Sequence, residues 1–126
     1  MILGVGIDII EVARIQASYE KFGERFLKRI LHANEIAYCL SHKMPAPFLA
    51  ARFAAKEAIS KAFGTGIGAR LGWQDMEVAR RDSGEPYVIL HGDGEKLLQE
   101  RGGRIVLISL SHTQQHATAV AILESA

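Results

Sequence analysis

The chain has 126 residues, and 48% of them are hydrophobic, which is enough for one compact domain with its own core. Fifteen basic and 14 acidic side chains leave a formal net charge of +1, so no overall field favours nucleic acid or an anionic membrane as a partner. A domain this small buries only about two-thirds of its unfolded surface, and oligomerisation is a natural way to bury more.

Cys39 is the only cysteine, which excludes an internal disulfide and fits a cytoplasmic protein. We expect it to be an inert, partly buried thiol, because no local activator of a thiolate is visible. The first apolar stretch is interrupted by Asp8 and is not preceded by a basic segment, so we expect no signal peptide. No window of roughly twenty apolar residues predicts a membrane span.

The first elements of the chain are a strand followed by helices. Residues 2–10 are rich in Ile and Val and predict a strand buried on both faces, with Asp8 inside it. Apolar residues at spacings of three and four predict a helix over 11–22, which Gly23 can end. Residues 24–31 predict a further short helix.

The clearest helix of the chain covers residues 48–63 and contains six alanines. Small side chains let a neighbouring element approach closely, so we expect this helix to be central. Gly64 ends it. Before it, Asn34 is a plausible N-cap for a short helix through Leu40, and residues 41–47 with two prolines read as a connector.

The second half of the chain is mostly strand. Strands are expected at 75–81, 86–91, 104–111 and 116–123, and a short amphipathic helix at 92–101. Residues 113–115 separate the last two strands, which favours an antiparallel hairpin. The order β-α-α-α-α-β-β-α-β-β predicts a single α+β domain over residues 1–126, with a mostly antiparallel sheet packed against the Ala-rich helix.

Two acids are candidates for chemistry. An acid inside an apolar strand, as Asp8 is, is unfavourable unless something neutralises it, although Asp8 could also point outward or cap a helix. Glu57 and Lys61 are about 40° apart on their helix, which by itself predicts an ordinary salt bridge. Because Ala54 and Ala58 flank Glu57, we expect the pair to border the packed face and to be only partly solvated.

Cations and glycines surround these acids in the sequence. Arg52, Lys56 and Ser60 form one stripe, which is either a solvated face or a site for an anion such as a nucleotide phosphate. The Gly-rich loop 64–68 allows backbone N–H groups to converge on an anion, but it lacks the lysine of a P-loop and follows a helix rather than preceding one.

The segment 109–113 places His112 among hydroxyl side chains at a strand end, where it can bind phosphate or simply form a turn. The sequence shows no G-x-S-x-G nucleophile motif and no His/Cys cluster with zinc spacing. Mg²⁺ is usually held by one or two carboxylates together with substrate phosphates, and the sequence offers two acids, several cations and a Gly-rich loop. If the chain is an enzyme, phosphate-ester chemistry is therefore the best class of reaction.

Three segments of the chain, residues 4–11, 52–68 and 109–113, closely resemble the holo-acyl-carrier-protein synthases, the short stand-alone 4′-phosphopantetheinyl transferases. The match holds in order and spacing and covers essentially the whole chain. The Phe-x-x-Lys-Glu-x-x-x-Lys core, which begins at Phe53, is its most specific part.

The resemblance implies an activity: the phosphopantetheine of coenzyme A is moved to a serine of apo acyl carrier protein, releasing adenosine 3′,5′-bisphosphate, with fatty acid biosynthesis as the default setting. It implies Mg²⁺ held by Asp8 and Glu57 with the coenzyme A pyrophosphate, and a homotrimer with active sites at subunit interfaces. Glu57 would accept the serine proton directly or through a metal-bound water, and Lys61 would stabilise or protonate the leaving phosphate.

The resemblance also implies two binding surfaces. The coenzyme A cradle would contain Arg52, Gly64, Thr65, Gly66, Gly68, His112 and Thr113. A basic strip with an apolar anchor would bind the acidic carrier protein; it consists of Arg14, Lys21, Arg25, Phe26 and Lys28. Without the resemblance, that strip would read as an ordinary solvated face.

Other functions remain open from the residues alone. A non-catalytic coenzyme A or nucleotide-binding module would keep the cradle and need no acidic pair, so the presence of both Asp8 and Glu57 argues against it. A purely structural trimeric subunit has support only from size and the Ala-rich helix. The accepted carrier protein, from fatty acid, polyketide or peptide synthases, is not determined.

Overall fold

The computed structural model describes all residues from Met1 to Ala126 and confirms the expected α+β order of elements. The elements are β1 (Ile2–Glu11), α1 (Val12–Phe22), α2 (Glu24–Ile30), α3 (Ala33–Leu40), α4 (Ala46–Phe63), the 3₁₀ turn η1 (Trp73–Asp75), β2 (Met76–Arg80), β3 (Pro86–Leu90), α5 (Asp93–Glu100), β4 (Gly103–His112) and β5 (His116–Ser125). None of the helices combines the length and the apolar character that crossing a bilayer requires.

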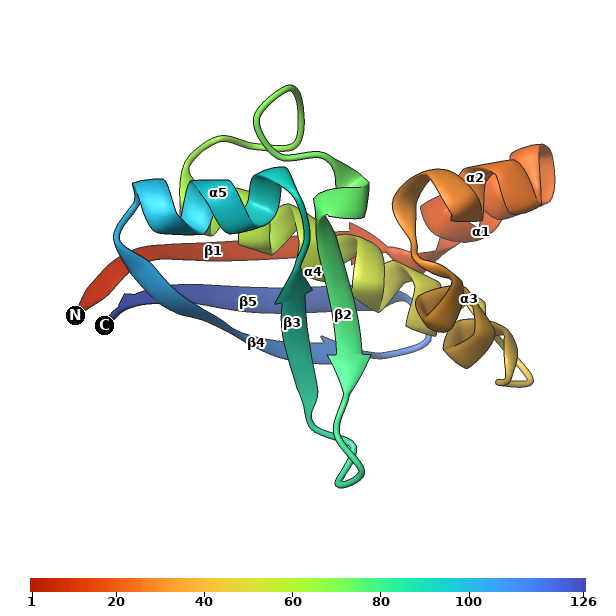
Figure 1. Cartoon of the computed structure of the whole chain (residues 1–126). Helices are drawn as coiled ribbons and strands as arrows, with labels where there is room; N and C mark the ends of the chain where they lie inside the picture. Colours follow the sequence, from red (N-terminus) through yellow and green to blue (C-terminus); the bar gives the residue numbers. More distant parts are fainter.

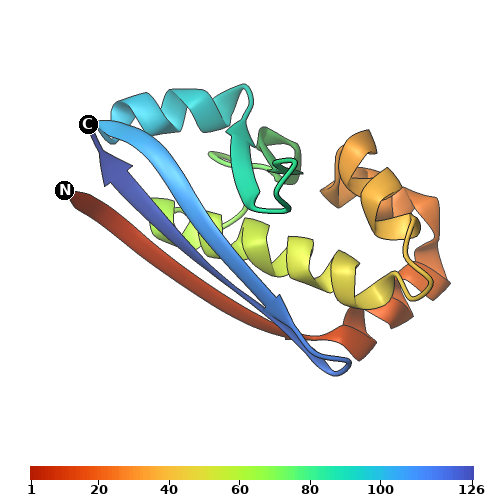
Figure 2. The same ribbon diagram turned by 90° about the horizontal axis from the view of Figure 1, so that it is seen from below.

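The strands form a three-stranded antiparallel sheet in the order β1-β5-β4 and a separate β2–β3 hairpin. Helix α4 runs along one face of the three-stranded sheet, and the β2–β3 hairpin and α5 lie on the other side of α4 (Figures 1 and 2). Helices α1, α2 and α3 gather at the end of the sheet opposite the two termini (Figure 1). Helix α4 is therefore the centre of the molecule, as its alanines predict.

The contact between α4 and β1 is unusually close. Fourteen of the 18 residues of α4 are buried, so this helix has almost no solvent face. A Cβ atom added to Gly6 would lie 1.9 Å from the carbonyl oxygen of Ala58, and one added to Gly4 would lie 2.0 Å from that of Ala62. Only glycine lets the strand and the helix backbones approach to this distance.

The outer face of β1 differs from the expectation of a strand buried on both faces. Val5, Ile7 and Ile9 are 59%, 65% and 68% exposed, whereas Gly6 and Ile10 on the opposite face are buried against α4. The alternation follows from the two-residue period of a strand, and no other element of this chain covers the outer face. The outer face of β1 is apolar, but the single chain does not bury it.

Two helix boundaries also differ from expectation. The N-cap of α3 is His32 rather than Asn34, and its backbone N–H donates to Glu35 Oε1 at 2.7 Å. Helix α4 begins at Ala46 instead of residue 48, because proline fits the first turn of a helix and Pro47 does not interrupt it. The expected end of this helix at Gly64 is confirmed, with φ of 79°.

Candidate active site

The close contact between β1 and α4 brings the predicted metal carboxylates and the predicted lysine to one place. Asp8 follows Gly6 on the inner face of β1, and Lys61 Nζ donates to Asp8 Oδ1 at 3.0 Å and to the carbonyl oxygen of Ile7 at 2.9 Å. Asp8 therefore neither points outward nor caps a helix. Lys61 is paired across the strand–helix contact, and the salt bridge with Glu57 within the helix is not formed.

Glu57 completes this acidic pair one helical turn before Lys61. Burial raises the pKa of Glu57 above its ordinary value of 4.5, and the carboxylate of Asp8 raises it further, while Lys61 acts in the opposite direction. Two carboxylates that oppose each other's ionisation are a suitable set of hard oxygen ligands for Mg²⁺, since a divalent cation relieves their repulsion. The residues present thus fit the metal that the sequence implies.

Lys56 corrects the expectation of a cationic stripe on α4. Its side chain is fully buried, and Nζ donates to Glu35 Oε1 at 2.9 Å and to the carbonyl oxygens of Ile30 at 2.6 Å and Trp73 at 3.2 Å. Burial lowers the pKa of Lys56, and the charge of Glu35 offsets part of that change. All three donor hydrogens are used inside the protein, so Lys56 holds four segments together and is not available to an external anion.

Arg52 is buried as well, but it keeps an unused donor. Its side chain is 4% exposed, its Nε has no hydrogen-bond partner, and its guanidinium lies over the Tyr38 ring at 4.2 Å. Arg52 lines a cavity of about 160 Å³ together with Tyr38, Arg80 and His112. A buried cation with an unpaired donor beside a cavity is suited to an anionic group, as expected for the cradle.

The Gly-rich loop does not present free amides in the way that the sequence suggested. The N–H groups of Thr65 and Gly66 both donate to the carbonyl oxygen of Ser60 at 3.2 Å, and that of Gly68 donates to Leu71 at 3.0 Å. The amide of Gly64 donates to Lys61 at 3.0 Å. These amides end the helix and shape the loop, so membership of the loop in the cradle stays a prediction.

His112 and Thr113 lie exposed at the turn between β4 and β5. His112 packs edge-on against Phe48, with ring centroids 4.8 Å apart. The Thr113 hydroxyl oxygen accepts the N–H of His116 at 3.1 Å, so this side chain shapes the turn. The sequence left phosphate binding and turn formation open for this segment. His112 lines the Arg52 cavity, where it can contact a phosphate, whereas the Thr113 side chain stabilises the turn.

The predicted site residues form two separate groups in the single chain. Leu110, which lines the Arg52 cavity, and Asp8 both pair with Ala119 of β5, from its opposite sides. Neighbouring strands are about 4.8 Å apart, so the two backbones are separated by about 10 Å. On α4, Arg52 and Glu57 point about 140° apart around the helix. The chain does not bring the acidic pair and the His112 cavity into one pocket.

Two features of this region are invisible in the sequence. Tyr38 lies between the guanidinium groups of Arg52 and Arg80, at 4.2 Å and 4.4 Å, and its hydroxyl accepts from Arg80. A cavity of about 660 Å³, wide enough for a nucleotide-sized ligand, is lined by Val12, Lys43 and Gln115 among others. No local pattern connects these positions, because only the fold brings them together.

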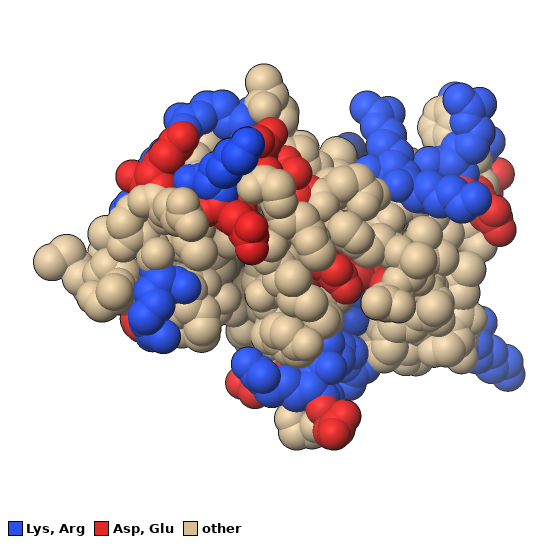
Figure 3. Space-filling model, viewed as in Figure 1, with Lys and Arg blue, Asp and Glu red and all other residues tan.

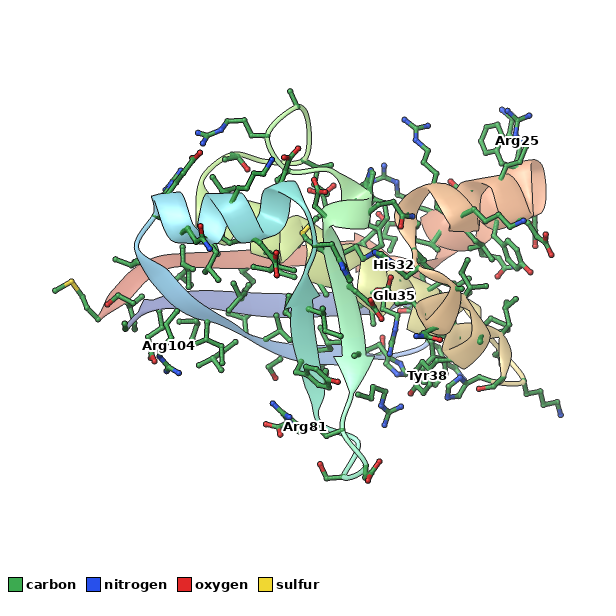
Figure 4. All side chains as sticks on the ribbon, in the orientation of Figure 1. Arg25, His32, Glu35, Tyr38, Arg81 and Arg104 are labelled. Carbon is green, nitrogen blue, oxygen red and sulfur yellow. The ribbon has the colours of Figure 1, made fainter.

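The basic strip lies where the sequence places it, on α1 and α2. Arg14, Lys21, Arg25 and Lys28 are exposed, and the blue surface over these two helices is one of the main basic areas in Figure 3. Arg25 projects from α2 at the far end of the molecule (Figure 4). Phe26 is half-buried and packs against the core rather than standing free in the strip.

Fold and site define a class of transferase. The chain belongs to the 4′-phosphopantetheinyl transferase superfamily, whose family model matches residues 4–121. The holo-[acyl-carrier-protein] synthase of Chlamydia trachomatis serovar L2 is 54% identical over 121 residues, which are 96% of this chain and 98% of that protein. The enzyme of the same name from Koribacter versatilis is 50% identical over 124 residues, covering 98% of this chain and 99% of that protein.

Solved structures of the same family superpose on this chain. The holo-[acyl-carrier-protein] synthase of Neisseria meningitidis has a TM-score of 0.91 at 34% identity and covers 99% of this chain and 100% of its own. The Bacillus anthracis synthase, solved in complex with coenzyme A (3′,5′-ADP), has a TM-score of 0.84 at 41% identity and covers 100% of this chain and 99% of its own. The resemblance seen in the sequence is confirmed.

The electrostatics of the acidic pair predict opposite effects of two substitutions on the pKa of Glu57. Asp8→Asn removes a negative neighbour and lowers this pKa, whereas Lys61→Met removes a positive one and raises it further. The carboxyl carbon of Glu57, followed by ¹³C NMR against pH in Mg²⁺-free buffer, reports both. Shifts in the same direction in the two variants would contradict this arrangement.

The raised pKa of Glu57 makes the stability of the folded chain depend on pH. A carboxyl with a raised pKa in the folded state contributes stability below its ordinary pKa of 4.5, and this contribution is lost as pH rises through the raised value. Asp8→Asn should therefore reduce the loss of stability that Glu57 causes when it ionises. Unfolding in urea at a series of pH values on both sides of 4.5 measures that change.

Proposed function

We propose that this chain transfers the 4′-phosphopantetheine of coenzyme A to a serine of apo acyl carrier protein, giving the holo carrier protein and adenosine 3′,5′-bisphosphate. The observation that carries the proposal is the Asp8–Glu57 pair, held beside Lys61 at the β1–α4 contact. Coenzyme A complexes of the Helicobacter pylori and Bacillus anthracis synthases support the same co-substrate. We infer that the enzyme works in the cytoplasm and serves fatty acid biosynthesis.

The chain's own residues suit a transfer in which the nucleophile comes from the partner. Asp8 and Glu57 would hold Mg²⁺, which supplies charge neutralisation and polarisation at the phosphate under attack when it is bound. Glu57, beside Asp8, would take the proton of the carrier serine directly or through a metal-bound water. Lys61, half-exposed and already beside Asp8, is placed to neutralise the leaving phosphate.

Arg52 and His112 are proposed to bind the nucleotide end of coenzyme A. The unpaired Nε of Arg52 and the exposed ring of His112 border one cavity, which fits an anionic group such as a phosphate. Arg52 and Glu57 point about 140° apart around α4, so the cavity and the acidic pair lie on different sides of this helix, and one chain alone does not explain how a single coenzyme A contacts both groups. A neighbouring copy that brings its own His112 toward Asp8 would solve this problem.

The exposed apolar face of β1 provides a surface for that copy. Val5, Ile7 and Ile9 line it, with Leu107 of β4 also 46% exposed. An apolar face of this extent on a small domain favours burial against another subunit. We propose that the chain forms a homotrimer with its active sites at the subunit interfaces.

The reaction itself is tested by a mass assay on apo acyl carrier protein with coenzyme A. We expect the wild-type chain to add the mass of one phosphopantetheine in the presence of Mg²⁺ and not after chelation. Asp8→Ala and Glu57→Ala should each lower turnover at least about a hundredfold, because each removes a metal carboxylate. The exposed acid of the β2–β3 turn offers a control, and Asp82→Ala should retain activity.

Two results of this assay would overturn the assignment. Full turnover by either Asp8→Ala or Glu57→Ala would remove the acidic pair from the mechanism. Coenzyme A binding by the wild-type chain without turnover of several apo carriers would instead support a non-catalytic binding module.

The shared site predicts complementation between two inactive variants. Asp8→Ala damages the acidic group and His112→Ala the cavity group, so a mixed trimer contains interfaces that join two intact halves. Every mixed trimer, whichever variant it contains twice, has one intact site out of three, so the purified mixed species should recover about a third of wild-type activity. Co-expression with two different tags and tandem purification gives the mixed species. Activity no greater than that of the single variants would place the whole site within one chain.

The basic strip on α1 and α2 is proposed to dock the acidic carrier protein. Charge reversal by Arg14→Glu with Arg25→Glu should raise the KM for apo carrier protein at least about tenfold and leave the KM for coenzyme A within about twofold. Arg81→Glu, near the β2–β3 turn and away from α2 in Figure 4, is the matched control. An equal rise in both KM values would contradict docking on this strip.

A further inference from the structure

Two histidines and a glutamate that are far apart in the sequence come together beside the β2–β3 hairpin. His91 Nε2 lies 2.9 Å from Glu77 Oε1, and His32 Nδ1 lies 3.9 Å from the same oxygen. One ligand atom from each of the three side chains lies within 4.8 Å of the other two. His32 precedes α3, Glu77 belongs to β2 and His91 follows β3, so three separate segments meet here (Figure 4 labels His32).

The hydrogen bonding of His32 leaves its Nδ1 free to act as a ligand. His32 Nε2 lies 2.8 Å from the carbonyl oxygen of Gln74, which can only accept, so Nε2 carries the hydrogen. In the neutral ring, Nδ1 then presents its lone pair toward Glu77. A lone pair facing a carboxylate oxygen is repulsive unless a positive charge lies between them. Metal-binding histidines show the same arrangement, in which the second ring nitrogen donates to a backbone carbonyl.

Glu77 needs a positive partner that no lysine or arginine supplies. Its side chain is 11% exposed, and its only partners within salt-bridge distance are the two histidines. A buried carboxylate is unfavourable without a compensating charge. The nearby buried lysine, Lys56, is already paired with Glu35.

Hydrogen bonds outside the cluster fix the segments that carry the two histidines. The N–H of His32 donates to Glu35 at 2.7 Å, and that of His91 donates to the carbonyl oxygen of Asp75 at 2.9 Å. The backbone carbonyl of Gln74 orients His32, and the side-chain amide of Gln74 donates to the carbonyl oxygen of Leu31 at 3.0 Å. The cluster is therefore preorganised by the chain fold, and the half-exposed ring of His91 leaves a path from solvent.

We propose that His32, Glu77 and His91 form a binding site for one divalent transition-metal ion, best matched by Zn²⁺. Two imidazole nitrogens and one carboxylate oxygen are a recurring zinc ligand set, with a water in the fourth position. Tetrahedral zinc places its ligand atoms about 3.3 Å apart, between the 2.9 Å and 3.9 Å observed around Glu77 Oε1. The site shares no residue with Asp8 and Glu57, and its nitrogen ligands distinguish it from a magnesium site.

The bound ion would join the α2–α3 junction to the β2–β3 hairpin. It would connect three segments across 45 and 14 positions of sequence, from His32 to Glu77 and from Glu77 to His91. A metal that binds only the folded chain raises its stability. The expected role is thus a structural one, independent of the transfer reaction.

Zinc binding is tested on the chain freed of metal by chelator dialysis. Titration with ZnCl₂ by calorimetry, in buffer with millimolar Mg²⁺ to occupy the oxygen ligands of Asp8 and Glu57, should give one Zn²⁺ per chain. The Tm should rise with added Zn²⁺, and Co²⁺ in its place should produce the visible absorption of a tetrahedral site. No uptake of Zn²⁺ by the wild-type chain under these conditions overturns the proposal.

Variants assign the ion to these side chains. His91→Gln and Glu77→Gln should each weaken Zn²⁺ binding at least about tenfold. His91→Gln is the primary variant because its half-exposed side chain can be replaced without opening the core, and circular dichroism verifies its fold. His116→Gln, which changes an exposed histidine outside the cluster, should bind as wild type. Unchanged affinity in both cluster variants, or an equal loss in His116→Gln, overturns the assignment.

Discussion

The architecture depends on how closely β1 approaches α4. Gly4 and Gly6 have no Cβ, and the carbonyl oxygens of Ala58 and Ala62 occupy the space where one would lie. The same strand face continues to Asp8, so the backbone contact sets the distance from this carboxylate to Lys61. A larger residue at either glycine would separate the strand from the helix and move the acidic pair apart, which links the packing of the core directly to the proposed chemistry.

Helix α4 uses its charged residues for different purposes according to the layer that each one faces. Lys56 is directed away from the three-stranded sheet and compensates the buried Glu35, whereas Lys61 reaches β1 and compensates Asp8. Arg52 lies in a third environment, between Tyr38 and a small cavity, and its Nε has no hydrogen-bond partner. Cations that look equivalent along the helix therefore differ in what they can bind, since only those with unused donors can receive a ligand.

Two features of the single chain support the proposed assembly with further copies. The outer face of β1 exposes Ile7 and Ile9, and the residues of the proposed site are divided between the acidic pair and the His112 cavity. Both are explained by one proposed arrangement, in which a second copy covers the apolar face and supplies the missing half of the site. The His32–Glu77–His91 cluster lies on different elements, and its proposed metal would brace the chain from within.

The sequence by itself determined the order of elements, the central position of the Ala-rich helix and the family, because periodicity, glycine positions and contiguous motifs are local properties. It also identified Asp8, Glu57 and Lys61 as candidates. Only the tertiary structure decided that Lys61 pairs with Asp8, that Lys56 is buried against Glu35, and that the loop amides are used inside the chain. Pairing and burial depend on contacts between segments distant in sequence, and the spacing of residues along one helix does not specify which layer each face will meet.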